Sequence, residues 1–486
     1  MEKKNLYVLM LAALLSCSDS VKVGRTLDEA PAIFPDYAGV VIPPNIAPLN
    51  FALKDMDTDA RAVFSFEGQQ FEVKGKKGSF VIPASKWKKL LESAAGNSIR
   101  VTVQAKQGNE WVAYAPFSIQ VAREKVDSYL AYRLIDPGYE LWNKMGIYQR
   151  NLENYTQSAI IENKMSGNNC VNCHSFCMQN PDKMLFHMRE TFPGTILVDG
   201  GKIEKLNTKT KETMSSLVYP SWHPSGKYVA FSVNATKQAF HLNDKNRVEV
   251  YDEASDVVVY DVQKHEIVTT SKIFSKDAYE TFPTFSPDGK TLYFCTAEAR
   301  PIPQEYSEIK YNLCSISFDP ETRAFGSQVD TLYNAKSGGM SASFPRVSPD
   351  GRYLLYTLSG YGNFSIWHKD ADLYLADLST GASRPLTEVN SDDVDSYHSW
   401  SSNSRWFVFS SRRIDGLYTR PYIAYVGEDG KIGKPFLLPQ KETDFYQGFM
   451  KSFNIPEFIT GKVKVQGRAL AIKAKDDKGT DVRFAK

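Results

Sequence analysis

Apolar and polar positions follow a repeated pattern between residues 190 and 440. Four segments, which begin at Trp222, Phe285, Val347 and Trp400, place a polar turn of the Ser-Pro-Asp-Gly type before a run of aromatic and β-branched residues. Proline presets the backbone at the second turn position and Asp-Gly closes the turn, so each segment predicts a β-hairpin. The starting residues are 63, 62 and 53 positions apart, and such a period indicates stacked supersecondary units.

Each unit continues into a second predicted hairpin. Its first strand is expected at residues 256–262, 312–318, 372–378 and 421–426 in the four units. Four strands per unit, repeated radially, are typical of the blades of a β-propeller. The repeats resemble the Ser-Pro-Asp-Gly blades of TolB-type propellers, over about half of the chain, and this resemblance implies a fold rather than an activity.

A degenerate fifth unit precedes the four clear ones. Residues 180–187 match the turn and strand of the other units with one Gly missing, and residues 194–198 and 202–206 form its second hairpin. Five blades are therefore visible. A sixth would draw on segments that the pattern does not place, including the tail after Phe453.

The residues before the repeats divide into two parts. Short strands separated by turns over 37–124 predict a β-sandwich of immunoglobulin or fibronectin type, with a helix over 85–95 capped by Ser85. Residues 125–169 are expected to form a helical connector, because apolar residues recur there at three- and four-residue steps. These apolar residues are Trp142, Met145, Tyr148, Leu152, Tyr155 and Ala159. The predicted fold is therefore mainly β: a sandwich, a connector, a propeller over 170–455 and a C-terminal tail over 456–486.

The N-terminus has the features of an export signal. Lys3 and Lys4 precede a short apolar run, and this run ends at Ser16 and Cys17. The ending resembles the lipobox of bacterial lipoproteins, which implies a signal peptide over 1–16, a lipidated Cys17 and a tether over 17–36. Acyl chains on Cys17 would hold the protein at a membrane surface. Ser18 stands where Asp usually signals inner-membrane retention, and so the resemblance favours the outer membrane of the cell envelope.

Composition excludes several classes of function. The chain of 486 residues is 42% hydrophobic and carries a formal net charge of +2, which suits a large folded protein with more than one domain. The lack of a Lys/Arg block argues against nucleic acid as a partner. The chain also lacks the nucleophile elbow, the zinc-protease motif and the phosphate-binding loop.

One pentapeptide carries specific chemistry. Cys170-Val171-Asn172-Cys173-His174 has the spacing of a haem c attachment site, in which two thiols add across the haem vinyl groups and the following imidazole ligates the iron. The alternatives are a zinc or iron–sulfur site that includes Cys177, or a disulfide or free thiols. Export to the envelope, where bacterial haem c is attached, favours one covalent haem c.

The motif falls where the other units have their incoming strand, as at residues 219–222. The haem is therefore expected at the rim of the first blade rather than in a separate helical cytochrome domain. The second axial ligand is predicted to be His187, which would make a bis-imidazole iron of lower potential than a Met ligand would give. Alternatives are an open sixth position or one of three methionines: Met184, Met178 and Met188.

Other residues could surround the haem. Tyr148 and Trp142 are candidates for its aromatic wall, although such residues more often pack against a neighbouring domain. Arg150 or Arg189 could pair with its propionates.

The remaining cysteines raise the question of a disulfide. Cys295 and Cys314 lie on consecutive predicted strands, so a cross-strand disulfide is feasible in an oxidising compartment if their registers match, and two buried thiols are the alternative. Cys177 would then be the odd thiol, buried beside the haem.

These features predict a membrane-anchored envelope lipoprotein in which a propeller carries one haem c for electron transfer. The alternative is a propeller scaffold that binds proteins or ligands, with a structural or absent haem. A third possibility is haem-based redox catalysis, which requires an open or displaceable sixth ligand. The expected partners are the membrane and redox or scaffold proteins of the envelope.

Overall fold

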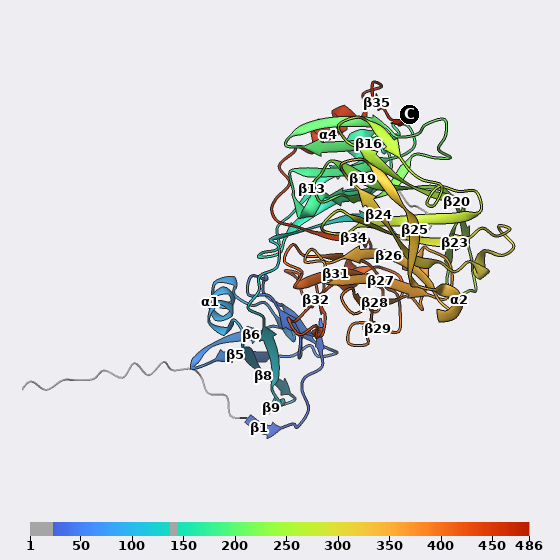
Figure 1. Cartoon of the computed structure of the whole chain (residues 1–486). Helices are drawn as coiled ribbons and strands as arrows, with labels where there is room; N and C mark the ends of the chain where they lie inside the picture. Colours follow the sequence, from blue (N-terminus) through green and yellow to red (C-terminus); the bar gives the residue numbers. More distant parts are fainter. Residues whose placement is uncertain (1–22, 137–143, 486) are drawn as a thin grey trace, which may run out of the picture.

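The computed structural model describes residues 23–136 and 144–485. The predicted signal peptide, Cys17 and Trp142 lie outside these residues. A smaller N-terminal part, drawn in blue and cyan, packs against a larger body of β-sheets (Figure 1). No helix in the described ranges is long and apolar enough to cross a membrane.

The N-terminal part contains a seven-stranded and a three-stranded sheet. The larger sheet has the order β1-β9-β8-β10-β3, with β5 paired to β8 and β6 to β5, and the smaller sheet has the order β2-β4-β7. Their bounds are β1 Val23–Thr26, β2 Ile33–Phe34, β3 Val41–Ile42, β4 Phe51–Leu53, β5 Ala60–Phe66, β6 Gln69–Gly75, β7 Ser79–Phe80, β8 Ser98–Gln107, β9 Glu110–Ala113 and β10 Phe117–Val121. Strands β1 and β2 belong to these sheets, so the predicted tether over 17–36 was too long.

The predicted helix in this part is present as α1 (Ala84–Ala94). It buries an apolar face that includes Trp87 and Leu91, and the Trp87 indole N–H donates to the carbonyl of Ile46 at 3.1 Å. The predicted cap was wrong: the helix begins after Pro83, and no side chain caps its first turn. Proline suits a helix start because its fixed φ is helical and the first N–H groups have no partner within the helix.

Five four-stranded antiparallel arrays follow in chain order, one for each predicted repeat. They are β14 Val171–Phe176, β15 Lys183–Met188, β16 Gly194–Asp199 and β17 Lys202–Asn207; β18 Leu217–Trp222, β19 Tyr228–Phe240, β20 Val248–Asp261 and β21 Glu266–Val268; β22 Ala278–Phe285, β23 Thr291–Glu298, β24 Asn312–Asp319 and β25 Ala324–Tyr333; β26 Ser341–Val347, β27 Tyr353–Ser359, β28 Asp372–Asp377 and β29 Ser383–Pro385; β30 Asp395–Trp400, β31 Trp406–Ser411, β32 Arg420–Tyr425 and β33 Phe436–Leu437. The Ser-Pro-Asp-Gly turns lie between the first and second strands, as expected.

A sixth sheet combines residues from both sides of the repeats. Its order is β13-β12-β11-β34, where β11 is Tyr129–Ile135, β12 is Gly146–Asn151, β13 is Gln157–Glu162 and β34 is Ser452–Ile459. The predicted helical connector over 125–169 was therefore wrong. The three- and four-residue spacing of its apolar positions arises because short strands are interrupted by a turn, in which the Asn151 N–H donates to the carbonyl of Thr156.

One edge strand of each of the six sheets lies at the centre, and we call these six the first strands. Together they close a ring. Strands β14, β18, β22, β26, β30 and β34 contact one another in that order, and β34 contacts β14. This arrangement is propeller-like, and its last sheet joins the C-terminal β34 to β11 by antiparallel pairing (Figure 1). The predicted boundary at residue 455 falls inside β34, and so the predicted ranges 170–455 and 456–486 also need correction.

The C-terminal residues pack along the outside of the ring instead of forming a free tail. Strand β35 (Thr480–Asp481) pairs in parallel with β17, and β36 (Arg483–Phe484) pairs in parallel with β21. The remaining helices are α2 Ala335–Gly338, α3 Phe445–Gly448 and α4 Gly467–Ala474, with single 3-10 turns at Asn163–Ser166, Cys177–Gln179, Tyr306–Glu308 and Ser365–Trp367.

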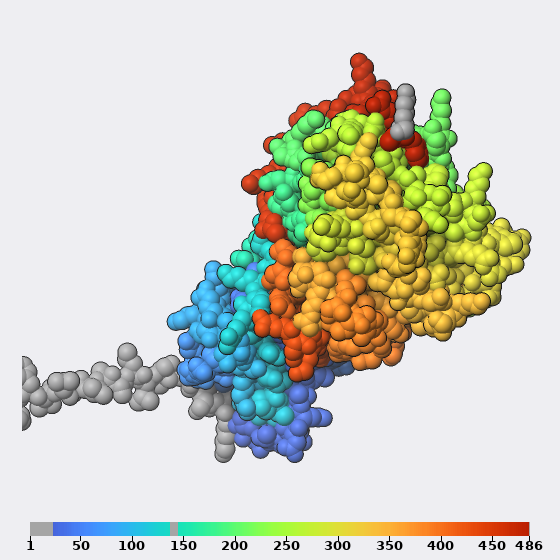
Figure 2. All heavy atoms as spheres, in the orientation of Figure 1, coloured from blue at the N-terminus to red at the C-terminus, as the bar shows by residue number. Residues whose placement is uncertain are grey.

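The N-terminal part contacts one side of the ring (Figure 2), and the two parts share an apolar core and polar contacts. The Tyr37 hydroxyl donates to the carbonyl of Leu437 at 3.3 Å, and the Asn50 amide donates to the carbonyl of Lys441 at 2.9 Å. The Ser402 N–H donates to the Asp127 carboxylate at 2.7 Å. These contacts fix the N-terminal part beside the sheet of β30–β33, away from the centre of the ring.

Candidate functional site

The centre of the ring is built from one repeated backbone feature. Each first strand has one irregular residue at which the pairing register shifts and φ is positive, between 48° and 52°. These residues are Cys173, Tyr219, Phe282, Phe344, Tyr397 and Ile455. A β-bulge re-aims the side chain of its strand. We call these six residues the waist.

Aromatic rings fill most of the waist. The ring centroids of Tyr219 and Phe282 are 4.8 Å apart, those of Phe282 and Phe344 are 4.0 Å apart, and those of Phe344 and Tyr397 are 4.7 Å apart. Cys173 and Ile455 are the two members of the set without an aromatic ring, and Cys173 is the smaller of them. The predicted haem motif therefore coincides with a gap in the aromatic packing at β14.

A cavity of about 300 Å³ lies on one side of the waist, and we call it the thiol cavity. Both Cys170 and Cys173 line it, and the Asn172 amide donates to the Cys170 sulfur at 3.5 Å. Burial raises the pKa of the Cys170 thiol, an effect that Arg133 and Arg189 oppose. The structure thus brings the two motif cysteines to one cavity wall.

The thiol cavity is rich in cationic side chains. Arg133, Arg189, Arg412 and Lys237 line it, against the carboxylates of Asp136 and Glu190. Asp136 is paired with Lys451 outside the lining at 2.6 Å. The Arg412 guanidinium carbon lies 3.7 Å from the ring centroid of Trp367, which also lines the cavity. The cavity therefore suits an aromatic ligand that carries negative charge.

His174 lies on the other side of Cys173. It lines a second cavity of about 150 Å³, which we call the axial cavity, and Cys173, Tyr219, Tyr397 and Ile455 line both cavities. The imidazole is 3% exposed, and neither nitrogen makes a hydrogen bond of normal geometry with a described residue. Burial lowers its pKa to about 3, Arg133 acts in the same direction, and the backbone of Ile455 opposes the shift. A buried neutral imidazole without a partner is costly, and ligation would satisfy it.

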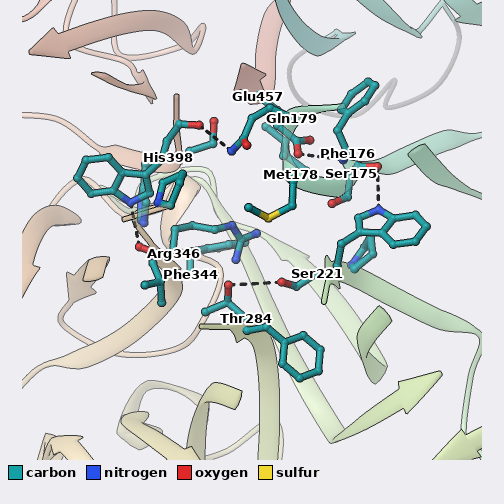
Figure 3. Close-up of a pocket in the computed structure, with 18 of the residues that line it drawn as sticks. Ser175, Phe176, Met178, Gln179, Ser221, Thr284, Phe344, Arg346, His398 and Glu457 are labelled. Carbon is teal, nitrogen blue, oxygen red and sulfur yellow. Dashed lines mark hydrogen bonds between the residues drawn. The ribbon is translucent and has the colours of Figure 1, made fainter. Parts of the chain in front are cut away.

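Residues from all six first strands line the axial cavity (Figure 3). Met178 points into it, and Arg346, His398 and Glu457 lie around it. His398 Nε2 donates to the carbonyl of Leu355 at 2.9 Å, and burial lowers the His398 pKa to about 3. Burial raises the pKa of Glu457 to about 8. Two groups oppose this shift: the N–H of Phe176, which donates a hydrogen bond to the Glu457 carboxyl, and the positive charge of Arg346.

The structure separates the candidates for the second axial ligand. His187 lies opposite Asn172 on β15, its Nδ1 is 3.3 Å from the Thr195 hydroxyl, and it lines neither cavity. Met184 and Met188 pack in the apolar core between β12 and β16. Of the four predicted candidates, Met178 is the one that reaches a cavity lined by a motif residue.

The other predicted residues divide in the same way. Arg189 lines the thiol cavity, whereas Arg150 donates to the Gln440 side chain at 2.6 Å and joins the sixth sheet to the loop after β33. Tyr148 donates to Glu162 at 2.9 Å and lines neither cavity. Arg133, Arg412, Trp367 and Arg346 were missed, because strand closure and loop packing bring them together and no local motif marks them.

The remaining cysteines form no second site. Cys295 and Cys314 are free thiols, because Cys295 pairs with Leu313 and Phe294 with Cys314, so the two cysteines face opposite sides of their sheet. The registers do not match, so the possible disulfide is not formed and the alternative of two buried thiols holds. Cys177 is buried in the core between β15 and β19 rather than at a cavity, and burial raises its pKa to about 11. Among the described residues, no three His, Cys, Asp or Glu side chains lie close enough together to hold a metal ion. This applies also to the residues of the zinc alternative, which included Cys177.

The fold and the site define a mainly β, propeller-like protein with two cavities at the ring centre. No protein-family model and no curated protein sequence matches the chain. Among solved structures, the chain is similar to the tricorn protease at 12% identity, with 71% of this chain and 34% of that chain covered and a TM-score of 0.36. It is also similar to an ancestral GH74 enzyme at 11% identity, with 64% and 38% covered and a TM-score of 0.35. The chain thus spans about a third of the length of these structures.

A smaller solved structure is covered almost completely. This is a DUF4784 family protein from Bacteroides caccae, at 8% identity, with 73% of this chain and 95% of that chain covered and a TM-score of 0.29. These likenesses concern the β-rich fold alone.

Proposed function

We propose that this chain is a six-bladed, TolB-like propeller that carries one covalent haem c and transfers electrons at the cell envelope. One observation carries the proposal: the two cysteines of the haem motif face one cavity, at one of the two positions where the waist lacks an aromatic side chain. The lipobox-like sequence at Cys17 supports a lipid anchor.

The residues around the thiol cavity fit a haem in two respects, and a third residue lies next to the cavity. Cys170 and Cys173 supply the thioether sulfurs from one wall. His174 follows directly but lines the axial cavity, so its imidazole would have to turn past Cys173 to ligate an iron in the thiol cavity; neither ring nitrogen makes a hydrogen bond of normal geometry with a described residue. Arg133, Arg189 and Arg412 supply the positive charge that two propionates need.

The haem would supply a one-electron redox couple, and the residues of this chain would set its environment. Burial keeps the His174 imidazole neutral, the form that ligates iron. Trp367 and Phe364 line the thiol cavity and would exclude water from the macrocycle, and a drier site changes the potential. None of the four candidate second ligands lines the thiol cavity, and Met178 lines the axial cavity on the other side of Cys173.

The test is the spectrum of the protein expressed with haem-ligation machinery. We expect a pyridine haemochrome spectrum for about one haem per chain, which stays with the protein after acid–acetone extraction. Cys173→Ala should lose one thioether bond, and Cys170→Ala with Cys173→Ala should yield haem-free protein. Cys314→Ala is the matched control, because that cysteine is buried in another sheet, and it should retain the haem. A colourless wild-type protein from a host that matures other c-type cytochromes would refute the proposal.

The anchor has its own test. We expect the wild-type chain to fractionate with membranes and Cys17→Ala to remain in the soluble periplasmic fraction. Ser18→Ala is the control and should leave the fractionation unchanged. Membrane association of Cys17→Ala equal to that of wild type would refute the lipid anchor. It would leave the haem proposal unaffected.

A further inference from the structure

The axial cavity contains an arginine that no described carboxylate neutralises. Arg346 follows the waist residue Phe344 by two positions and reaches into the cavity (Figure 3). The one hydrogen bond of its guanidinium within the described residues goes from Nη1 to the carbonyl of Pro345 at 2.8 Å. No described carboxylate lies within ion-pairing distance, although the charge of Glu457 acts on it. Most of its donors are therefore left for another partner.

Glu457 is held away from this arginine by the backbone. Its carboxyl oxygen accepts the N–H of Phe176 at 2.9 Å, across the junction between β34 and β14. The two imidazoles of the cavity, His174 and His398, are buried. Arg346 is thus the one Lys or Arg side chain among the described residues that line the axial cavity, and its guanidinium has five N–H donors, few of which are used.

Two tryptophans form an apolar and rigid part of the remaining wall. The Trp222 indole N–H donates to the carbonyl of Ser175 at 3.3 Å, and the Trp400 indole N–H donates to the carbonyl of Arg346 at 3.0 Å. Both rings are fixed by these bonds, and their apolar surfaces line the cavity together with Phe285. Pro224 and Pro287 line it at the side of the hairpin turns.

Size and polarity together restrict the ligand. A cavity of about 150 Å³ accommodates a molecule of the size of benzene. A guanidinium recognises a carboxylate through two parallel hydrogen bonds, and the burial of the pair strengthens them. Hydroxyl groups of Ser221 on β18 and Thr284 on β22, the strand next to that of Arg346, lie 3.4 Å apart and provide further polar contacts.

We propose that the axial cavity is a binding site for a small carboxylate with an apolar body, and that Arg346 is the residue that recognises the carboxylate. The site is distinct from the thiol cavity, because Cys170 and the arginines of the thiol cavity do not line it. Its ligand would lie beside His174, on the opposite side of the waist from Cys170.

Calorimetry with benzoate tests the proposal on the full mature chain purified from a host with haem-ligation machinery. We expect saturable binding of benzoate and at least tenfold weaker binding of benzyl alcohol, which has the same body without the charge. Arg346→Gln should weaken benzoate binding at least tenfold. Arg352→Gln is the matched control, because this exposed arginine lies on the same sheet outside the cavity, and it should bind benzoate as wild type does.

A second readout covers the case in which Arg346→Gln fails to fold. Benzoate should change the tryptophan fluorescence of wild type, and Trp222→Phe should reduce this change while Arg346 is retained. Absence of benzoate binding to wild type at millimolar concentration would overturn the proposal. Equal affinity of folded Arg346→Gln and wild type would overturn it as well. Because Cys173 and His174 also line the axial cavity, the pyridine spectrum measures the haem content of each sample, and the variants are compared at equal haem content.

Discussion

His174 and His398 occupy the same position on two first strands of the ring, directly after the waist residues Cys173 and Tyr397. Both imidazoles are buried, and burial lowers the pKa of each to about 3. They differ in one respect: His398 donates to the carbonyl of Leu355, whereas neither nitrogen of His174 makes a hydrogen bond of normal geometry with a described residue. The first strands β18, β22, β26 and β34 have proline at this position, namely Pro220, Pro283, Pro345 and Pro456.

The prolines make it possible to separate a structural role of His174 from a role as ligand. Because proline occurs at the equivalent position of four first strands, we expect His174→Pro to fold and to lower the melting temperature by only a few degrees. We also expect this variant to lose the low-spin Soret band of the iron-ligated haem. His398→Pro is the control and should keep the spectrum, at a cost of about 1 kcal/mol for its lost hydrogen bond. An unchanged spectrum in folded His174→Pro would contradict the ligand role.

The gap in the waist can be filled by substitution. Cys173→Phe introduces the residue that Phe282 and Phe344 provide at equivalent positions, also with positive φ. We expect its stability in urea to stay within about 1.5 kcal/mol of wild type, because the cavity accepts the ring. We also expect loss of covalent haem. Phe344→Cys enlarges the axial cavity from another strand. We expect it to lower the free energy of unfolding by about 3 kcal/mol and to retain the haem.

The closure of the ring of strands by β34 can also be tested by unfolding in urea. Phe453 is 1% exposed, and its ring centroid lies 4.8 Å from that of Tyr132 on β11. Removal of the phenyl ring of Phe453 leaves a cavity between the two ends of the repeat array. Phe453→Ala should therefore lower the free energy of unfolding by about 3–4 kcal/mol. Met450→Ala, three residues earlier and 70% exposed, should change it by less than about 0.5 kcal/mol. Equal stability of the two variants would mean that β34 does not close the ring in solution.

Stability should depend on pH through Glu280. This carboxyl is 2% exposed, one of its oxygens has no partner among the described residues, and burial raises its pKa to about 8. Between the ordinary pKa and about 8, the unfolded chain loses this proton while the folded chain keeps it, so the contribution of Glu280 to stability falls as the pH rises.

Glu280→Gln should remove this loss. We expect the variant to be more stable than wild type at pH 8 by about 1–2 kcal/mol, and the difference to shrink at pH 5. Urea unfolding at the two pH values measures it. Glu298→Gln, an exposed residue of β23, is the control and should follow wild type at both. A stability difference of the same size at pH 5 and pH 8 would show that Glu280 does not titrate in this range.

The sequence alone determined the features that depend on neighbours in the chain. Ser-Pro-Asp-Gly turns and the apolar runs after them are local signals, and so the hairpins after Trp222, Phe285, Val347 and Trp400 were predicted close to their observed bounds. The same local alignment placed Cys170 to His174 on an incoming strand, and β14 occupies that place.

Tertiary structure decided what depends on contacts between distant residues. The apolar spacing before Cys170 fits a helix as well as short strands, and the pairing of β11 with β34 resolves this ambiguity across more than 300 residues. The register of β23 and β24, which turns Cys295 and Cys314 to opposite faces, is set by the whole sheet. The gap at Cys173, the arginines of the thiol cavity and the unpaired Arg346 exist only once six first strands meet, because no local pattern records which side chains face the centre of a closed ring.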